Sequence, residues 1–209
     1  MSNDVVQAVA HYVEETMGSE GFRYVSAVVA NCKMLAVQLE TQEDHPVSLD
    51  TDALVIAAYF HDISTVAHGF LDHHMKSAEL AAEFLQDCNV PEECIAKVQQ
   101  AILTHITILP QEDRGELTEG QVLYDADKLG RLSGLAVVTS LIEFGTRYLN
   151  QVVTREMLAA LLRHIEERFI ELYQSLYTAP AREMAREKFH HTLAFLDGVI
   201  EHLSDATPV

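Results

Sequence analysis

The chain has 209 residues, of which 32 are acidic and 14 basic, so its formal net charge is -18. Such a charge repels the phosphate backbone of nucleic acid and anionic membrane surfaces, and we therefore expect neither polymeric nucleic acid nor a membrane as a partner. This length is sufficient for one sizeable hydrophobic core, and we predict a single domain over residues 1–209.

The cysteines and the N-terminal residues indicate the cellular compartment. Cys32, Cys88 and Cys94 lie in helix-like segments without C-x-x-C spacing, so neither a disulfide framework nor a thiolate zinc site is indicated. The sequence begins Met-Ser-Asn-Asp, which lacks the charged and apolar regions of a signal peptide, and no apolar run approaches about 18 residues. We expect a cytoplasmic protein.

Apolar residues at helical spacing predict two helices near the N-terminus. The first covers residues 4–17 and stops at Gly18, and the second covers 22–39. The polar stretch 41–50, which contains Pro46, predicts a loop.

The next segment is the most informative in the chain. After Asp50, seven apolar or aromatic residues run from Leu54 to Phe60 and are followed directly by His61 and Asp62. Their spacing predicts a helix that is buried on most sides. Burying an imidazole and a carboxylate is costly unless another group compensates, and a bound cation satisfies both. The pair is therefore a candidate for metal ligation.

The middle of the chain predicts two further helices that carry histidine. One covers about 72–88, and the other begins at Pro91, which is well placed as a first helical residue. The apolar face of this second helix includes His105, so its ring is predicted to point inward. Residues 106–118 predict a loop.

The remainder of the chain is also helical in pattern. A helix is predicted from about 118 to 144, and two long amphipathic helices over 154–177 and 181–203 are separated at Pro180. Strand and hairpin patterns are not found, so we predict an all-α fold. Aromatic residues of this part indicate either core or a dimer face, and a homodimer stays open: Tyr148, Phe169, Tyr173, Phe189 and Phe195.

Histidine and aspartate residues recur along the predicted helices in the order His61-Asp62, His73-His74, His105 and Asp125-Ala-Asp127. A mixture of imidazole nitrogen and carboxylate oxygen suits Mn, Fe, Co, Ni or Zn, and several buried imidazoles without a counter-ion would be costly. His74 shares a stripe with Ala78, but periodicity alone separates neither His74 from His73 nor Asp127 from Asp125.

The order of these motifs resembles the HD superfamily of metal-dependent phosphohydrolases. The similarity covers about residues 22–141 and rests on four phrases: His61-Asp62, His74-Met-Lys-Ser77-Ala78, Ile102-Leu-Thr-His105 and Asp125-Ala-Asp-Lys-Leu129. It implies an HD-domain/phosphodiesterase-like helical bundle, to which the helices over about 154–203 would add.

The resemblance also implies a ligand set and a reaction. His61, Asp62 and Asp127 would hold one divalent ion, and Asp62 would bridge to a second ion held by His74 and His105. One or two transition-metal ions are expected, with Mg left open. The implied reaction is metal-assisted hydrolysis of a phosphate ester, in which the ions activate water and neutralise the phosphoryl oxygens.

Nearby side chains complete the predicted active site. We expect Asp62 and His68 to act in catalysis, His68 as a proton donor to the leaving group. The cations closest in sequence to the motifs, and therefore the candidates for binding substrate phosphate, are Lys76, Lys128 and Arg131.

One residue departs from the family pattern. The family begins with a histidine in a His-x-x-x-Val phrase, and the matching phrase here is Tyr24-Val-Ser-Ala-Val28. Tyr24 could ligate as phenolate, hydrogen-bond a metal-bound water or merely fill space, and the first ion would then bind loosely or not at all.

The leading hypothesis from sequence is a phosphohydrolase acting on a small substrate, a nucleotide or related phosphate ester. Two alternatives stay open. One is a di-iron oxygenase, because myo-inositol oxygenase and its relatives resemble the same arrangement of histidine and aspartate. The other is a non-catalytic ligand-binding protein on a degenerate HD scaffold, for which Tyr24 is the main argument.

Overall fold

In the computed structural model, residues 3–42, 47–148 and 152–205 are described, and residues 43–46 of the predicted loop lie outside this set. The described residues form helices and no strand, which confirms the all-α class. They cluster into two compact units, Met1–Asp127 and Lys128–Val209. The single domain expected from sequence stays a prediction, and each unit is described by itself.

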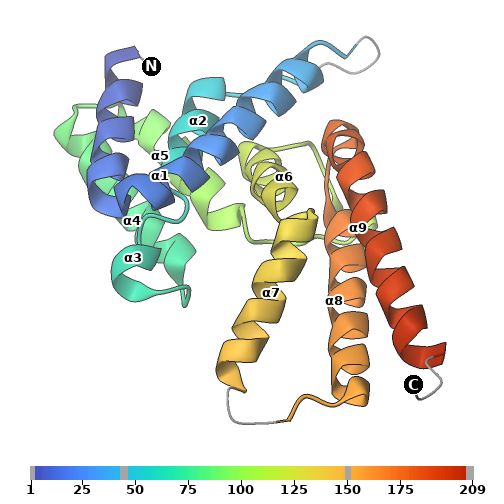
Figure 1. The fold of residues 1–209 in the computed structure, drawn as a ribbon. Helices are drawn as coiled ribbons and strands as arrows, with labels where there is room; N and C mark the ends of the chain where they lie inside the picture. The colour runs from blue at the N-terminus through green and yellow to red at the C-terminus, as the bar shows by residue number, and fades with distance from the viewer. Residues whose placement is uncertain (1–2, 43–46, 149–151, 206–209) are drawn as a thin grey trace. The chain divides into compact units, whose positions relative to one another are not determined.

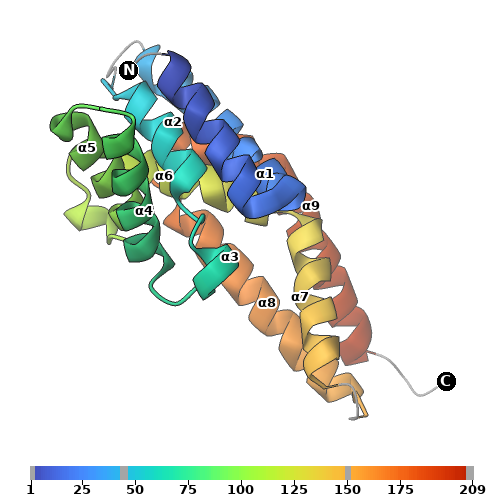
Figure 2. The ribbon, with the colours of Figure 1, turned by 90° about the vertical axis from the view of Figure 1, so that its left-hand side faces the viewer.

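The first unit is a helical bundle built around α2. Its elements are α1 (Asn3–Glu40), α2 (Thr51–Phe60), α3 (Thr65–His68), α4 (His73–Asp87), α5 (Glu92–Thr104), a 3-10 turn (Gln111–Asp113) and most of α6 (Glu119–Arg131). Helix α2 packs against α1, α4 and α5, and α4 packs against α5 (Figures 1 and 2). The short α3 lies between two of the predicted helices, and the 3-10 turn lies within residues 106–118, where the sequence predicted a loop.

Helix α1 changes direction at Gly18. The backbone there has φ 70° and ψ 176°, a left-handed conformation that glycine adopts without a steric penalty. Figure 1 shows the two straight pieces on either side of this kink. Both pieces contribute to the core, since Val13 in the first and Val25 in the second are fully buried. The break predicted from sequence at Gly18 is thus confirmed.

Helix α2 is fixed at its start by Asp50. The Asp50 carboxylate accepts a hydrogen bond from the Ala53 N–H at 3.1 Å and lies 3.2 Å from the Lys97 ammonium on α5. Burial tends to raise the pKa of Asp50, but these two contacts outweigh it, so the pKa is lowered overall. The anchored helix buries every residue from Ala53 to Phe60 except Tyr59, as the sequence pattern predicted.

The second unit contains three long helices that alternate in direction. These are α7 (Gly134–Arg147), α8 (Arg155–Ser175) and α9 (Ala179–Asp205), with α9 packed against both of the others (Figure 1). The continuous helix predicted from 118 to 144 is wrong, because the backbone at Ser133 is extended with φ -148° and ψ 159°. The sequence does hold a signal for this break in Gly130, Ser133 and Gly134, which all favour helix ends over interiors.

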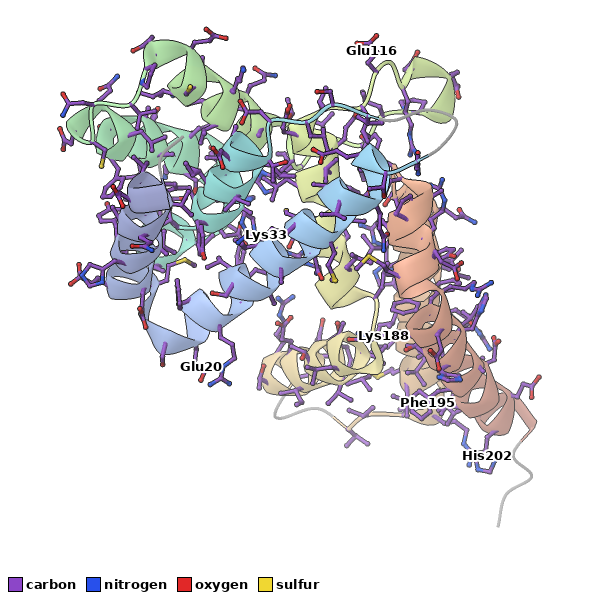
Figure 3. The ribbon with its side chains drawn as sticks, turned by 90° about the horizontal axis from the view of Figure 1, so that it is seen from above. Glu20, Lys33, Glu116, Lys188, Phe195 and His202 are labelled. Atoms are coloured by element: carbon purple, nitrogen blue, oxygen red, sulfur yellow. The ribbon has the colours of Figure 1, made fainter. Side chains whose placement is uncertain are left out.

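The core of the second unit joins its three helices through Val137, Leu162 and Leu196. Phe189 on α9 stacks on Phe169 of α8, with ring centroids 5.3 Å apart, and both rings are buried. Phe195, by contrast, is 57% exposed on α9, where Figure 3 labels it. The aromatic residues therefore divide between core and surface, and the dimer stays a prediction.

Among the described helices, none is by itself long and apolar enough to cross a membrane. The segments Thr51–His68 and His73–Asp87 reach that threshold only as a pair, and they are bent by 114° at the break between them.

Candidate metal centre

Three histidines of the first unit are oriented in the same way by the backbone. His61 and His105 cap the C-terminal ends of α2 and α5, and their Nδ1 atoms lie 2.8 Å from the Ala58 carbonyl and 2.5 Å from the Ile102 carbonyl. His73 opens α4, with Nδ1 2.8 Å from the carbonyl oxygen of Phe70. A carbonyl oxygen can only accept, so each Nδ1 bears the hydrogen and each Nε2 offers a lone pair. This is how histidine is held when it ligates a metal.

The Asp62 carboxylate lies between these rings. Its Oδ1 is 3.3 Å from His73 Nε2, and its Oδ2 is 3.5 Å from His61 Nε2. Candidate ligand atoms of Asp62, His73 and His105 all lie within 4.8 Å of one another; we call this set the His73 group. On the other side, His61 Nε2 is 4.0 Å from Asp127 Oδ1; we call His61, Asp62 and Asp127 the His61 group. Each oxygen of Asp62 thus faces a different group.

Burial makes these groups costly without a cation. His61 is 0% exposed, and its Nε2 accepts no hydrogen bond from the described part of the chain. His105 and Asp127 are also buried, at 1% exposed each. An unsatisfied polar atom at such a depth costs about 1–3 kcal/mol. Imidazole nitrogens converging with carboxylate oxygens fit a divalent transition-metal ion, which would satisfy them together.

The structure distinguishes His73 from His74 in position. Asp72 has a left-handed backbone, with φ 54°, directly before α4 begins, and the His73 ring faces Asp62 from the first turn of the helix. The His74 ring centroid is 5.7 Å from that of His73, and its Nδ1 is buried with no hydrogen-bond partner among the described residues. Ligation by His74 stays a prediction. The helical period selected neither ring, and the family resemblance implied His74.

Two buried serines hold the start of α4 against the end of α2. The Ser64 N–H donates to Ser77 Oγ at 3.2 Å, Ser77 Oγ donates to Ser64 Oγ at 3.0 Å, and Ser64 Oγ donates to the His73 carbonyl at 2.9 Å. This chain of hydrogen bonds connects the segment after Asp62 to the first turn of α4. In the sequence, Ser77 stands out only as part of a motif, and Ser64 was not predicted because a lone serine gives no signal.

Helix α1 forms hydrogen bonds with Asp127 and with the backbone of α6. The Tyr24 hydroxyl donates a hydrogen bond to Asp127 Oδ1, and Asn31 Nδ2 donates to the Ala126 carbonyl at 3.0 Å. The Cys32 thiol is fully buried nearby; burial, with the charges of Asp127 and Asp125, raises its pKa strongly. Without a bound cation, Cys32 is therefore a neutral thiol at physiological pH.

The remaining predicted site residues lie farther along their helices. His68 is exposed at the end of α3, and Lys76 is half-buried on α4, one turn after His73. Lys128 and Arg131 lie in the last turn of α6. The second unit begins at Lys128, so this turn belongs to it. The proton-donor role of His68 and the phosphate-binding roles of the three cations stay predictions.

An all-α unit that gathers imidazoles and carboxylates around one aspartate is a helical protein with a candidate His/Asp metal centre. Comparison with family models agrees: the HD domain model matches residues 25–132, just over half of the chain. The chain belongs to the HD domain family, which confirms the resemblance seen in its motifs.

Solved structures show the same fold. A protein described as an HD-superfamily hydrolase from Bacillus thuringiensis is 18% identical with a TM-score of 0.66, covering 96% of this chain and 97% of its own. The Lin1889 protein from Listeria innocua is 16% identical with a TM-score of 0.68, covering 99% and 100%. YpgQ from Bacillus subtilis, in complex with ADP, is 17% identical with a TM-score of 0.64, covering 95% and 94%. No curated protein matches the chain.

Proposed function

We propose that this HD domain protein is a metal-dependent phosphohydrolase that acts on a small phosphate ester, a nucleotide or a related metabolite. The observation that supports it most directly is the set of three imidazoles whose Nδ1 atoms are held by backbone carbonyls and whose rings lie close to Asp62. Family membership supports the same class of function.

The residues divide into those that hold cations from inside and those that meet solvent. His61, His105 and Asp127 are almost fully buried, and the side chains of Asp62 and His73 keep small exposed fractions of 10% and 15%. We propose that substrate approaches along this exposed edge. One or two ions of Mn, Fe, Co, Ni, Zn or Mg, when bound, would supply Lewis acidity toward the phosphoryl oxygens and increase the acidity of water.

Apolar side chains lie next to this edge. The Phe70 ring centroid is 6.0 Å from that of His73, and Phe70 is 69% exposed. Its neighbours in sequence are exposed as well: Val66, Leu71 and Met75. An exposed aromatic ring beside the candidate centre could stack on a flat group such as a nucleobase. ADP bound to the similar YpgQ supports testing nucleotides first.

Charge and proton transfer set further requirements. A net charge of -18 repels an anionic substrate, so local cations must outweigh it. We assign this to the metal ions and to Lys76, with Lys128 and Arg131 as further candidates. Hydrolysis adds the oxygen of water to phosphorus and breaks the bond to the ester oxygen, which gains a proton. We propose His68 as the donor of that proton.

The test is phosphate release by the full chain after chelator treatment and reloading with each of these ions. Nucleotides and simple esters such as glycerol phosphate form the substrate panel. We expect turnover with at least one ion, and loss of it in Asp62→Asn with the helical circular dichroism kept. Phe70→Ala should raise KM for nucleotides and leave KM for glycerol phosphate unchanged.

Other outcomes would identify the alternatives. Metal binding without turnover on any substrate would contradict the hydrolase and favour the ligand-binding protein. Oxygen consumption by the iron-loaded chain, without phosphate release, would favour the oxygenase.

A further inference from the structure

The Tyr24 hydroxyl contacts the His61 group at one of its candidate ligand atoms. It donates its hydrogen bond to Asp127 Oδ1, the same oxygen that lies 4.0 Å from His61 Nε2. The Tyr24 ring centroid is 6.2 Å from that of His61. A phenol O–H thus contacts one of the oxygens that a cation of this group would use.

This hydrogen bond competes with a cation for the carboxylate. A phenol that donates its proton to Asp127 is stabilised by the charge of that carboxylate, and hydrogen bonds of this kind are stronger than neutral ones. A cation on Asp127 Oδ1 must displace the O–H or share the oxygen with it. Because a carboxylate has further lone pairs, the hydrogen bond weakens cation binding without abolishing it.

The His73 group has a different composition. It offers two imidazole nitrogens, of His73 and His105, and one oxygen of Asp62, whereas the His61 group offers one nitrogen and two carboxylate oxygens. Nitrogen-rich sites bind late first-row transition metals more tightly than oxygen-rich sites. Both groups depend on the carboxylate of Asp62, so a cation in one group repels a cation in the other.

We propose that Tyr24 makes the centre bind two cations in unequal steps, the first at the His73 group and the second, more weakly, at the His61 group. This inference rests on the metal-binding part of the proposed function and does not require hydrolysis. Removing a hydrogen bond to a charged group corresponds to a change of roughly tenfold or more in affinity, and the second step should change by that factor when the hydroxyl is removed.

The experiment is calorimetric titration of the chelator-treated full chain with Zn²⁺, with elemental analysis of the loaded protein. We expect the wild-type chain to give one tight step and one weak or undetected step. Tyr24→Phe removes the O–H and keeps the ring, so the second step should tighten roughly tenfold. Tyr24→His adds a nitrogen ligand and should tighten it further.

A matched control comes from the same helix. Tyr12, in the first piece of α1, stacks on Phe84 of α4 with ring centroids 4.5 Å apart. Tyr12→Phe should therefore leave both cation-binding steps unchanged. Circular dichroism and thermal unfolding would establish that every variant is folded.

Three results would overturn the inference. Two equal steps in the wild-type chain would contradict the unequal groups. A weaker second step in Tyr24→Phe would mean that the Tyr24 oxygen is itself a ligand. No cation binding at all would reject both this inference and the proposed function.

The failure of the inference and the failure of the proposed function can be told apart. Unequal binding of two cations without any hydrolysis would reject the function alone, and equal binding in an active enzyme would reject the inference alone.

Discussion

The placement of His73 at Asp62 gives the most direct prediction for the centre. His73→Ala removes an Nε2 that lies 3.3 Å from Asp62 Oδ1, together with its Nδ1 contact to Phe70. Loss of a residue that hydrogen-bonds a metal ligand lowers the affinity for the metal by about 10–100-fold. Loss of a ligand itself should therefore weaken the tightest cation by about 100-fold or more, which corresponds to about 2.8 kcal/mol.

The neighbouring ring supplies the comparison. His74→Ala removes a side chain of the same type one position later, whose Nδ1 is buried away from any hydrogen-bond partner in the described residues. It should change the affinity of the tight step by less than about threefold, a difference of about 0.7 kcal/mol. Competition titrations against a chelator of known affinity measure both values. If His74→Ala loses the cation and His73→Ala retains it, the geometric assignment is wrong and the ligand set implied by family resemblance is right.

Two further predictions concern stability. A Cβ on Gly120 would lie 1.9 Å from Thr104 Oγ1, so Gly120→Ala should destabilise the chain by about 1–3 kcal/mol in urea denaturation. The control is Gly130→Ala in the same helix, where a Cβ meets no described atom within 4 Å and stability should not fall. Equal effects of the two substitutions would contradict the close packing at Gly120. Burial, then the hydrogen bond and charge of Asp197, raises the pKa of Glu166, so this carboxyl favours folding below the ordinary glutamate pKa and loses that contribution as pH rises through its raised value. Glu166→Gln should therefore raise the melting temperature at pH 7 relative to the wild-type chain and remove this part of the pH dependence; an unchanged pH profile would count against the raised pKa.

Much of the fold follows from local sequence signals. The apolar run before His61 predicted a buried helix because every position but Tyr59 is apolar enough to face the core, and the structure buries them. Gly18 predicted a break because only glycine readily adopts the left-handed backbone found there. The break at Ser133 was missed because apolar spacing continues on both sides of it. The helix prediction followed this spacing and not the glycines beside Ser133.

The site was harder to predict at the level of single side chains. His73 and His74 are adjacent in the sequence, and helix α4 begins directly after Asp72, whose backbone is left-handed. Apolar spacing does not predict this backbone conformation, and so it does not predict which of the two rings faces Asp62. Tyr24 was recognised as a departure, but its partner Asp127 is 103 positions away in the sequence, so only the folded chain shows their hydrogen bond. The hydrogen bond from Ser64 to the His73 carbonyl joins residues only nine positions apart, but no helical period predicts it.

The carbonyl contacts of His61 and His105 also satisfy acceptors that a helix leaves without partners at its C-terminal end. The orientation of these two rings is thus coupled to the integrity of the last turns of α2 and α5. Conditions that fray those turns, such as urea well below the global unfolding midpoint, should loosen cation binding before the bundle itself melts.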